Sequence, residues 1–205
     1  MTRPPSRLLV VTDRRLARRP LELVVADALD GGARWVWFRD RDLAQDERRA
    51  LGVKLARLCA KAGATLSVGG EAEDSLAMGA NALHLPAGRD IAAARAALGE
   101  EALIGLSAHT LEEAKRAQLA GADYVTLSPI FETASKPGYG PSLGLGALSP
   151  ANGLSIPVVA LGGIDASNIA ACLAAGAACA AVMGAIMRAT SPRDAVKTLH
   201  EAASL

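Results

Sequence analysis

The stretch Pro157-Val158-Val159-Ala160-Leu161-Gly162-Gly163-Ile164 is an apolar run that ends abruptly in two glycines, and Ala180–Ile186 repeats this character around Gly184. Short runs of small and β-branched residues suit strands buried on both faces, as the strands of a parallel sheet are. Glycine after such a strand lets backbone N–H groups approach a ligand, because no Cβ stands in the way. In a closed (β/α)8 barrel the loops after the last two strands commonly hold a phosphate. We therefore expect these two stretches to be those loops.

Six further apolar runs precede this pair and supply the remaining strands. We expect strands at residues 8–12, 35–38, 65–68, 82–85, 102–106 and 124–127, and then at 157–161 and 179–182. Helical patterns fall between them, and the clearest repeats Leu51, Leu55 and Leu58 before Gly63 ends it. Regular alternation of strands and helices with short connections indicates a parallel sheet.

An open, doubly wound sheet is the competing arrangement. A dinucleotide-binding sheet needs a glycine-rich turn after its first strand, whereas Thr12-Asp13-Arg14-Arg15 stands there in this chain. The sequence therefore favours a single-domain (β/α)8 TIM barrel over residues 1–205. Such barrels usually need about 250 residues and shrink toward 200, so this one would have almost no insertions.

Composition narrows the function classes. The net charge of +1 gives no overall argument for binding nucleic acid or a membrane surface. No apolar run approaches the roughly 20 residues of a membrane span, and Leu8–Val11 is too short for the core of a signal peptide. Cys59, Cys172 and Cys179 share no metal-type spacing and lie in apolar surroundings, which predicts buried free thiols. We expect a cytoplasmic protein without nucleic-acid or membrane partners, and leave homo-oligomerisation open.

Residues at the carboxyl ends of barrel strands converge on one mouth. In this chain they include two guanidiniums, an ammonium, several hydroxyls and two glycine-rich loops, namely Arg39, Arg41, Gly69-Gly70, His84, Asp90, Ser107, His109, Thr133, Ser135, Lys136, Gly162-Gly163 and Met183-Gly184. The loop from Ser128 to about Gly144 is the longest irregular stretch, and loops of that length are usually functional or disordered. This inventory suits substrates that carry more than one phosphate group.

Each candidate also has an ordinary structural interpretation. Arg39 and Arg41 could pair with Asp40 and Asp42 on the surface. His109 could serve the entry of a helix, and His84 could pack in the apolar interior. Trp37 could stack on a ligand ring or fill the core, and Gly69-Gly70 could be no more than a tight turn.

The chain resembles the thiamine-phosphate synthases and the related TenI-like thiazole tautomerases across almost its whole length. The segment Phe131-x-Thr133-x-Ser135-Lys136, followed by Pro137-Gly138, is the most specific part of the resemblance. The other matching segments are Thr12-Asp13, Phe38–Asp42, Gly105–His109, Gly121–Val125, Ser128–Pro129 and Val159–Ile164.

The resemblance implies a transferase that joins a pyrimidinylmethyl diphosphate to a thiazole phosphate and releases diphosphate. Arg39, Arg41 and Lys136 would bind the diphosphate, and Ser107 would face the pyrimidine. Mg²⁺ would stabilise the leaving diphosphate. Asp90 is the carboxylate nearest to the position after the fourth strand where the family has a magnesium ligand. The residues that the resemblance implies would bind the thiazole phosphate are Thr133, Ser135, Gly162, Gly163, Met183 and Gly184.

Several positions depart from the family pattern. Trp37 replaces a glutamine, Gly69-Gly70 replaces an Asn-Asp pair, and Arg89 falls at the second magnesium carboxylate, with Asp90 one residue later. Pro129 stands where the tautomerases have a catalytic histidine, for which His109 or His84 could substitute. Two alternatives to the synthase therefore stay open: a thiazole phosphate tautomerase, and a paralogue that binds thiamine or thiazole phosphate without turnover.

Overall fold

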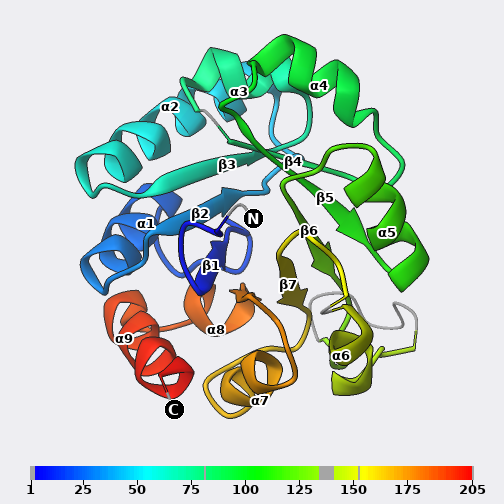
Figure 1. The fold of residues 1–205 in the computed structure, drawn as a ribbon. Helices are drawn as coiled ribbons and strands as arrows, with labels where there is room; N and C mark the ends of the chain where they lie inside the picture. The colour runs from blue at the N-terminus through cyan, green and yellow to red at the C-terminus, as the bar shows by residue number, and fades with distance from the viewer. Residues whose placement is uncertain (1–2, 81, 134–140, 152, 205) are drawn as a thin grey trace.

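The structure, a computed structural model, describes residues 3–80, 82–133, 141–151 and 153–204. Eight parallel strands close into a barrel in which each strand pairs with its neighbours in the chain and β8 pairs with β1 (Figure 1). The strands are β1 Leu8–Val11, β2 Trp35–Phe38, β3 Thr65–Gly69, β4 Ala82–Leu85, β5 Leu103–Ala108, β6 Tyr124–Leu127, β7 Val158–Leu161 and β8 Cys179–Val182. The predicted (β/α)8 barrel is confirmed.

Helices surround the barrel and follow the predicted alternation. They are α1 Leu21–Asp30, α2 Gln45–Lys61, α3 Ala72–Met78, α4 Ile91–Leu98, α5 Leu111–Leu119, α6 Leu148–Ala151, α7 Ile169–Ala174, α8 Gly184–Met187 and α9 Pro192–Ala203, with a 3₁₀ turn at Leu145–Ala147. The last helix, α9, packs beside α1 and completes the ring, where His200 Nε2 lies 3.1 Å from the carbonyl of Gly32. No helix among these residues is long and apolar enough to cross a membrane.

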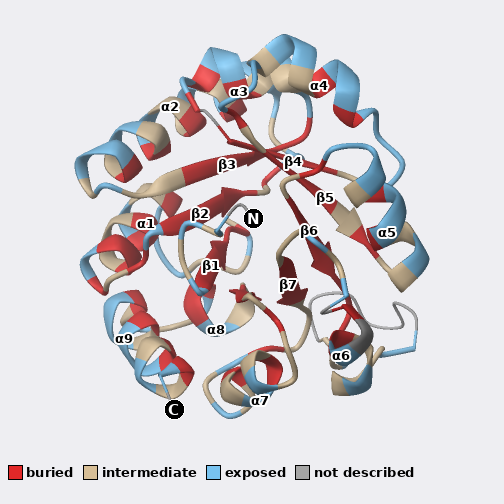
Figure 2. Ribbon diagram, in the orientation of Figure 1, coloured by how far each residue is buried: buried red, intermediate tan, exposed pale blue. Residues whose placement is uncertain are grey.

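Apolar side chains pack in two layers, one between the strands and the helices and one inside the barrel. Figure 2 shows that the strands are buried and that the helices expose their outer faces. The three cysteines are buried free thiols, as predicted.

The interior of the barrel is filled by pairing large residues with small ones. Trp35 contacts Tyr124 edge-on with ring centroids 4.8 Å apart, and the Tyr124 ring occupies the space that a side chain at Gly105 would need. A Cβ on Gly69 would lie 2.7 Å from Nε1 of Trp37. Protein interiors are close-packed, so these glycines make room for the aromatic rings. Gly69 is therefore more than a turn residue.

Candidate active site

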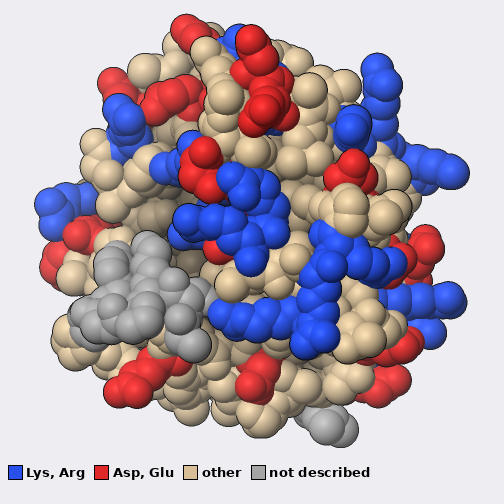
Figure 3. Space-filling model, turned by 180° about the vertical axis from the view of Figure 1, so that it is seen from behind, with Lys and Arg blue, Asp and Glu red and all other residues tan. Residues whose placement is uncertain are grey.

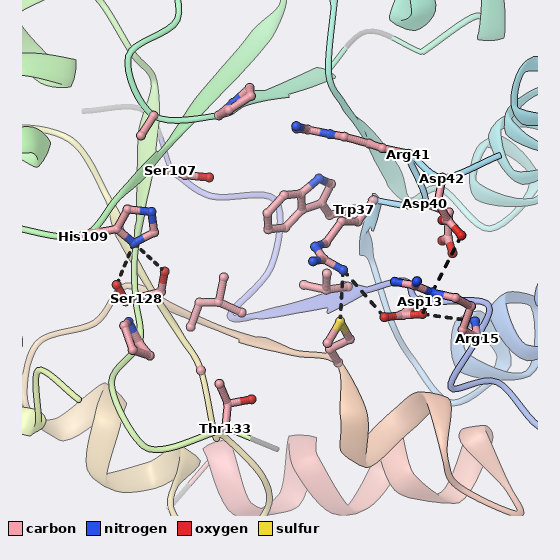
Figure 4. A pocket seen from close by; sticks show the side chains of 18 residues that line it. Asp13, Arg15, Trp37, Asp40, Arg41, Asp42, Ser107, His109, Ser128 and Thr133 are labelled. Atoms are coloured by element: carbon pink, nitrogen blue, oxygen red, sulfur yellow. Dashed lines mark hydrogen bonds and ion pairs between the residues drawn. The ribbon is translucent and has the colours of Figure 1, made fainter. Parts of the chain in front are cut away.

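A cavity of about 380 Å³ opens at the carboxyl ends of the strands. Lys and Arg side chains gather around the middle of this face, which Figure 3 shows from the side opposite to Figure 1. Seven of the residues predicted from the sequence line the cavity: Arg39, Arg41, Ser107, His109, Thr133, Gly162 and Met183. Figure 4 shows Ser107, His109 and Ser128 on one side of it, and Arg41, Asp13 and Arg15 on the other.

Two of the predicted backbone sites, Gly163 and Gly184, are not among the residues that line the cavity. Gly163 and Gly184 directly follow the lining residues Gly162 and Met183. Ser135 and Lys136 lie outside the described residues, so their predicted roles stay predictions.

Arg39 and Arg41 follow β2 and form what we call the arginine wall, together with Arg48 and Arg89. Arg39 lies 3.7 Å from Asp13 and 4.0 Å from the sulfur of Met183. Arg41 forms no ion pair with any other described residue. Burial lowers the pKa of Arg41, and the nearby charges of Arg48 and Arg39 lower it further. A guanidinium that lies close to other cations and has no ion-pair partner among the described residues, as Arg41 does, favours an anionic ligand.

The surface pairings considered for these arginines are not formed. Asp40 is buried and accepts hydrogen bonds from Thr12 Oγ1 at 2.6 Å and from the backbone N–H of Arg14 at 2.6 Å. Thr12 Oγ1 in turn accepts the backbone N–H of Arg39 at 3.0 Å. Asp42 pairs with Arg14 at 2.7 Å. These carboxylates therefore hold the loops after β1 and β2 in register, which fixes where the Arg39 side chain begins.

Arg48 is a buried guanidinium that the sequence analysis missed. It comes from α2 and donates to the carbonyls of Asp40 and Gly69 and, at 2.7 Å, to the carboxylate of Asp74. Its side chain also lies over the ring of Phe38, 5.2 Å from the centroid. Arg48 thus ties α2 to the loops after β2 and β3. A run of charged residues at the start of a helix gave no signal that one of them turns inward.

His84 is fully buried behind the cavity-lining residues Trp37 and Ser107, in a chain of polar groups. Its Nδ1 is 3.0 Å from Tyr124 Oη, and its Nε2 is 3.0 Å from Ser107 Oγ. Its ring contacts that of Trp37 at an interplanar angle of 44°, with the centroids 3.9 Å apart. Complete burial, aided by the charge of Arg41, lowers the pKa of His84 to about 3. The neutral ring carries one proton, and the phenol is a stronger donor than the serine hydroxyl. We therefore assign Tyr124 as donor to Nδ1, which leaves Nε2–H to donate to Ser107.

Ser107 lies within β5, at the point where the strand reaches the cavity. Because its oxygen accepts from His84, its own hydroxyl proton is directed to other acceptors, including a ligand. His109, two residues later, places Nδ1 2.9 Å from the carbonyl of Ser128. A carbonyl only accepts, so Nδ1 carries a proton and donates it to Ser128. Its backbone N–H bonds the carboxylate of Glu113 at 2.6 Å, which is the helix-entry role considered above.

The opposite side of the mouth, which we call the glycine wall, consists of Gly162 and Gly163 after β7. Their φ angles are 105° and 65°, values that favour glycine. A Cβ on Gly162 would lie 2.9 Å from Pro129 Cα, and one on Gly163 would collide with the carbonyl of Glu132. The loop after β6 is held against this wall because the N–H of Phe131 donates to the carbonyl of Gly162 at 3.1 Å. The glycines therefore allow two loops to meet at the cavity.

Asp90 is placed differently from the other predicted residues. It is exposed and precedes α4, where its Oδ1 accepts the N–H of Ala93 at 3.0 Å. This is a helix-capping bond. Asp90 is not among the residues that line the cavity.

The chain is similar to known proteins over almost its whole length. A family model described as thiamine monophosphate synthase matches residues 8–186. The thiamine-phosphate synthase of Roseiflexus sp. (strain RS-1) is 39% identical over 196 residues, covering 93% of this chain and 82% of its own. That of Halorhodospira halophila is 39% identical over 205 residues, covering 97% and 96%.

A solved structure agrees with these sequence matches. The thiamine phosphate pyrophosphorylase from Pyrococcus furiosus superposes with a TM-score of 0.87 at 32% identity, covering 97% of this chain and 95% of its own. The barrel, the convergent cavity and these matches together establish that the chain belongs to the thiamine monophosphate synthase family.

Proposed function

We propose that this protein is a thiamine-phosphate synthase, a transferase that joins a pyrimidinylmethyl diphosphate to a thiazole phosphate. The observation that carries the proposal is that the arginine wall and the glycine wall meet at one cavity. Arg39 and Arg41 line the cavity after β2, and Gly162 lines it after β7, three strands away around the barrel. One substrate carries a diphosphate and the other a monophosphate. The reaction therefore needs two separate sites for phosphate groups, with room for two rings between them.

The arginine wall would hold the diphosphate and stabilise it as it leaves. When the bond from the pyrimidine methylene carbon to the diphosphate oxygen breaks, the electron pair goes to the oxygen and the carbon becomes cationic. Positive groups fixed in advance beside the departing anion lower the barrier, because they need not reorganise during the reaction. Lys136 is the third cation that the family resemblance implies here.

The glycine wall would hold the thiazole phosphate with backbone N–H groups, and Met183 and Gly184 would extend it after β8. Thr133 and Ser135 would add hydroxyl donors. Held in this way, the thiazole nitrogen can add its lone pair to the cationic carbon as soon as that carbon forms. Trp37, with the buried His84 behind it, forms an aromatic floor beneath the reacting rings, and Ser107 offers a hydroxyl to the pyrimidine.

Purified protein mixed with both substrates and Mg²⁺ is the direct test, with thiamine phosphate measured by chromatography. We expect product well above a no-enzyme control, and a fall in kcat/KM of about 100-fold in Arg39→Ala, as is common when a transition-state charge contact is lost. The exposed Arg193 on α9 provides a matched control, since Arg193→Ala should leave the rate unchanged. Failure to form product above the control would refute the proposal.

Tautomerisation of a thiazole phosphate is the second candidate, because His109 lines the cavity with its ring fixed by the contact between Nδ1 and the carbonyl of Ser128. It predicts turnover of the thiazole phosphate alone, abolished in His109→Ala. A protein that is stabilised thermally by thiamine phosphate yet turns over neither substrate set would be the binding-only paralogue. As a synthase it would act on small phosphorylated molecules, and we propose that it does so in the cytoplasm.

A further inference from the structure

The residues after β3 and β4 do not fit the magnesium site that the family resemblance implies. Mg²⁺ in proteins is held by oxygen ligands in octahedral geometry, usually through one or two carboxylates together with phosphate oxygens. At the end of β3 this chain has Gly69, followed by Gly70, and neither offers a side-chain oxygen. After β4 it has Arg89, followed by Asp90, which caps α4.

Two guanidiniums and one carboxylate surround the space beside Gly70. A Cβ built there would lie 3.8 Å from a terminal nitrogen of Arg48, 4.0 Å from Nε of Arg41 and 4.0 Å from Oδ2 of Asp74. That Asp74 carboxylate is already ion-paired with Arg48 at 2.7 Å. A side chain at this position would thus enter a space between two guanidiniums. These groups repel a metal cation and attract an anion.

The loops after β3 and β4 are joined directly by an ion pair. Arg89 lies 2.9 Å from the carboxylate of Glu71, and both side chains are exposed. Two facing carboxylates need a cation between them, whereas a carboxylate facing a guanidinium does not. The arginine therefore makes the link between the loops that a shared metal would make.

The carboxylates near the cavity are engaged elsewhere. Asp13 lies beside Arg15 and Arg39, and Asp42 pairs with Arg14. In the described part of the chain, no three Asp, Glu, His or Cys residues are grouped so that they could hold a metal ion.

We propose that this protein binds the diphosphate in a cradle of guanidiniums, contributed by Arg39, Arg41 and Arg89 above the buried Arg48, without a metal ion held by protein carboxylates. The planar guanidinium presents two parallel N–H donors, a geometry that matches phosphate oxygens. The proposal takes the diphosphate ligand from the proposed synthase function. The binding of the anion can nevertheless be measured without any turnover.

Calorimetric titration of inorganic diphosphate into the whole protein tests the cradle. In the presence of a chelator we expect binding at least as tight as in millimolar Mg²⁺, and weaker binding as salt rises. Arg41→Gln should weaken the affinity for diphosphate by about tenfold or more. Arg41→Lys should weaken it by less, because it keeps the positive charge and loses only the two parallel N–H donors of the guanidinium. Arg193→Gln on α9 is the matched control and should change nothing. Mg²⁺ titrated alone should show no saturable binding.

Three results would overturn the inference: diphosphate affinity more than tenfold weaker in chelator than in Mg²⁺, saturable binding of Mg²⁺ alone, or no diphosphate binding in either condition. The outcome is separable from that of the proposed function. Product formation together with Mg²⁺-dependent diphosphate binding would keep the synthase and remove the cradle. Metal-independent binding without product would keep the cradle and remove the synthase.

Discussion

The two walls of the cavity are built on different physical principles. The arginine wall, which comes from the loops after β2 and β4 and from α2, uses long charged side chains, and buried carboxylates such as Asp40 hold the loop from which Arg39 begins. The glycine wall after β7 uses the absence of side chains, which allows Gly162 and Gly163 to contact the loop after β6. One wall depends on charge and the other on space. Removing a charge from the arginine wall should weaken anion binding by an amount that depends on salt. Adding a side chain to the glycine wall should instead destabilise the fold, because the new atoms collide with the neighbouring loop.

The glycine wall should give the largest effect of a single substitution. Gly163 and Gly63 have nearly the same φ, 65° and 62°, but only Gly163 has backbone atoms where a Cβ would lie. Gly63→Ala should cost about 1–2 kcal/mol of unfolding free energy through backbone strain alone. Gly163→Ala should cost about 1–3 kcal/mol more, because the loop after β6 must move. Urea unfolding of both variants measures the difference, and equal losses would show that this wall does not depend on space.

A glycine on the charged side offers a second comparison. The Cβ of Gly69→Ala would lie 2.7 Å from Trp37 Nε1 and 3.2 Å from the carbonyl of Phe38. We expect a loss of about 1–3 kcal/mol from overpacking. Trp37→Phe shortens the ring, so the double variant should recover part of that loss.

The coupling energy from this double-mutant cycle should reach about 1 kcal/mol or more, as for other residues in contact. Strict additivity of the two substitutions would refute the idea that Gly69 exists to make room for Trp37. A positive coupling would show that the two departures from the family pattern, at positions 37 and 69, are one change in packing.

Sequence reasoning succeeded where local pattern and chain order decide the structure. All eight strands were predicted at their positions in the chain, because parallel strands are short apolar runs between helices that end in glycine. Residues predicted at the ends of these strands, such as Arg39 and His109, line one cavity. It failed where burial depends on a distant partner. Arg48 looks like any charged residue of a solvated helix, and turns inward because the carbonyl of Gly69 needs a donor. Asp90 caps α4, a role that the sequence does not distinguish from metal binding, and its predicted metal role stays a prediction.

His84, which is buried beneath the cavity, should stay uncharged in the folded protein. Its pKa is lowered from 6.5 to about 3, so the unfolded chain binds a proton below pH 6.5 that the folded protein does not bind. Stability should therefore fall as pH drops below 6.5 and be unaffected by this group above it. Between pH 7 and pH 5 the expected loss is about 2 kcal/mol. Urea unfolding at the two pH values measures it, and His84→Gln should remove that part of the pH dependence. An unchanged slope in the variant would mean that His84 is protonated in the folded protein.

The smallest effect on stability is expected at Arg89, on the rim of the arginine wall. Its pair with Glu71 is exposed, and such pairs contribute between zero and about 1 kcal/mol because water screens the charges and ordering the side chains costs entropy. Arg89→Gln should therefore leave the unfolding free energy nearly unchanged while it weakens diphosphate binding and reduces the dependence of that binding on salt. The exposed pair of Lys115 and Glu112 on α5 offers the matched control, since Lys115→Gln should alter neither quantity. If Arg89→Gln instead destabilised the fold and left diphosphate binding intact, Arg89 would belong to the scaffold, and the arginine wall would end at Arg41.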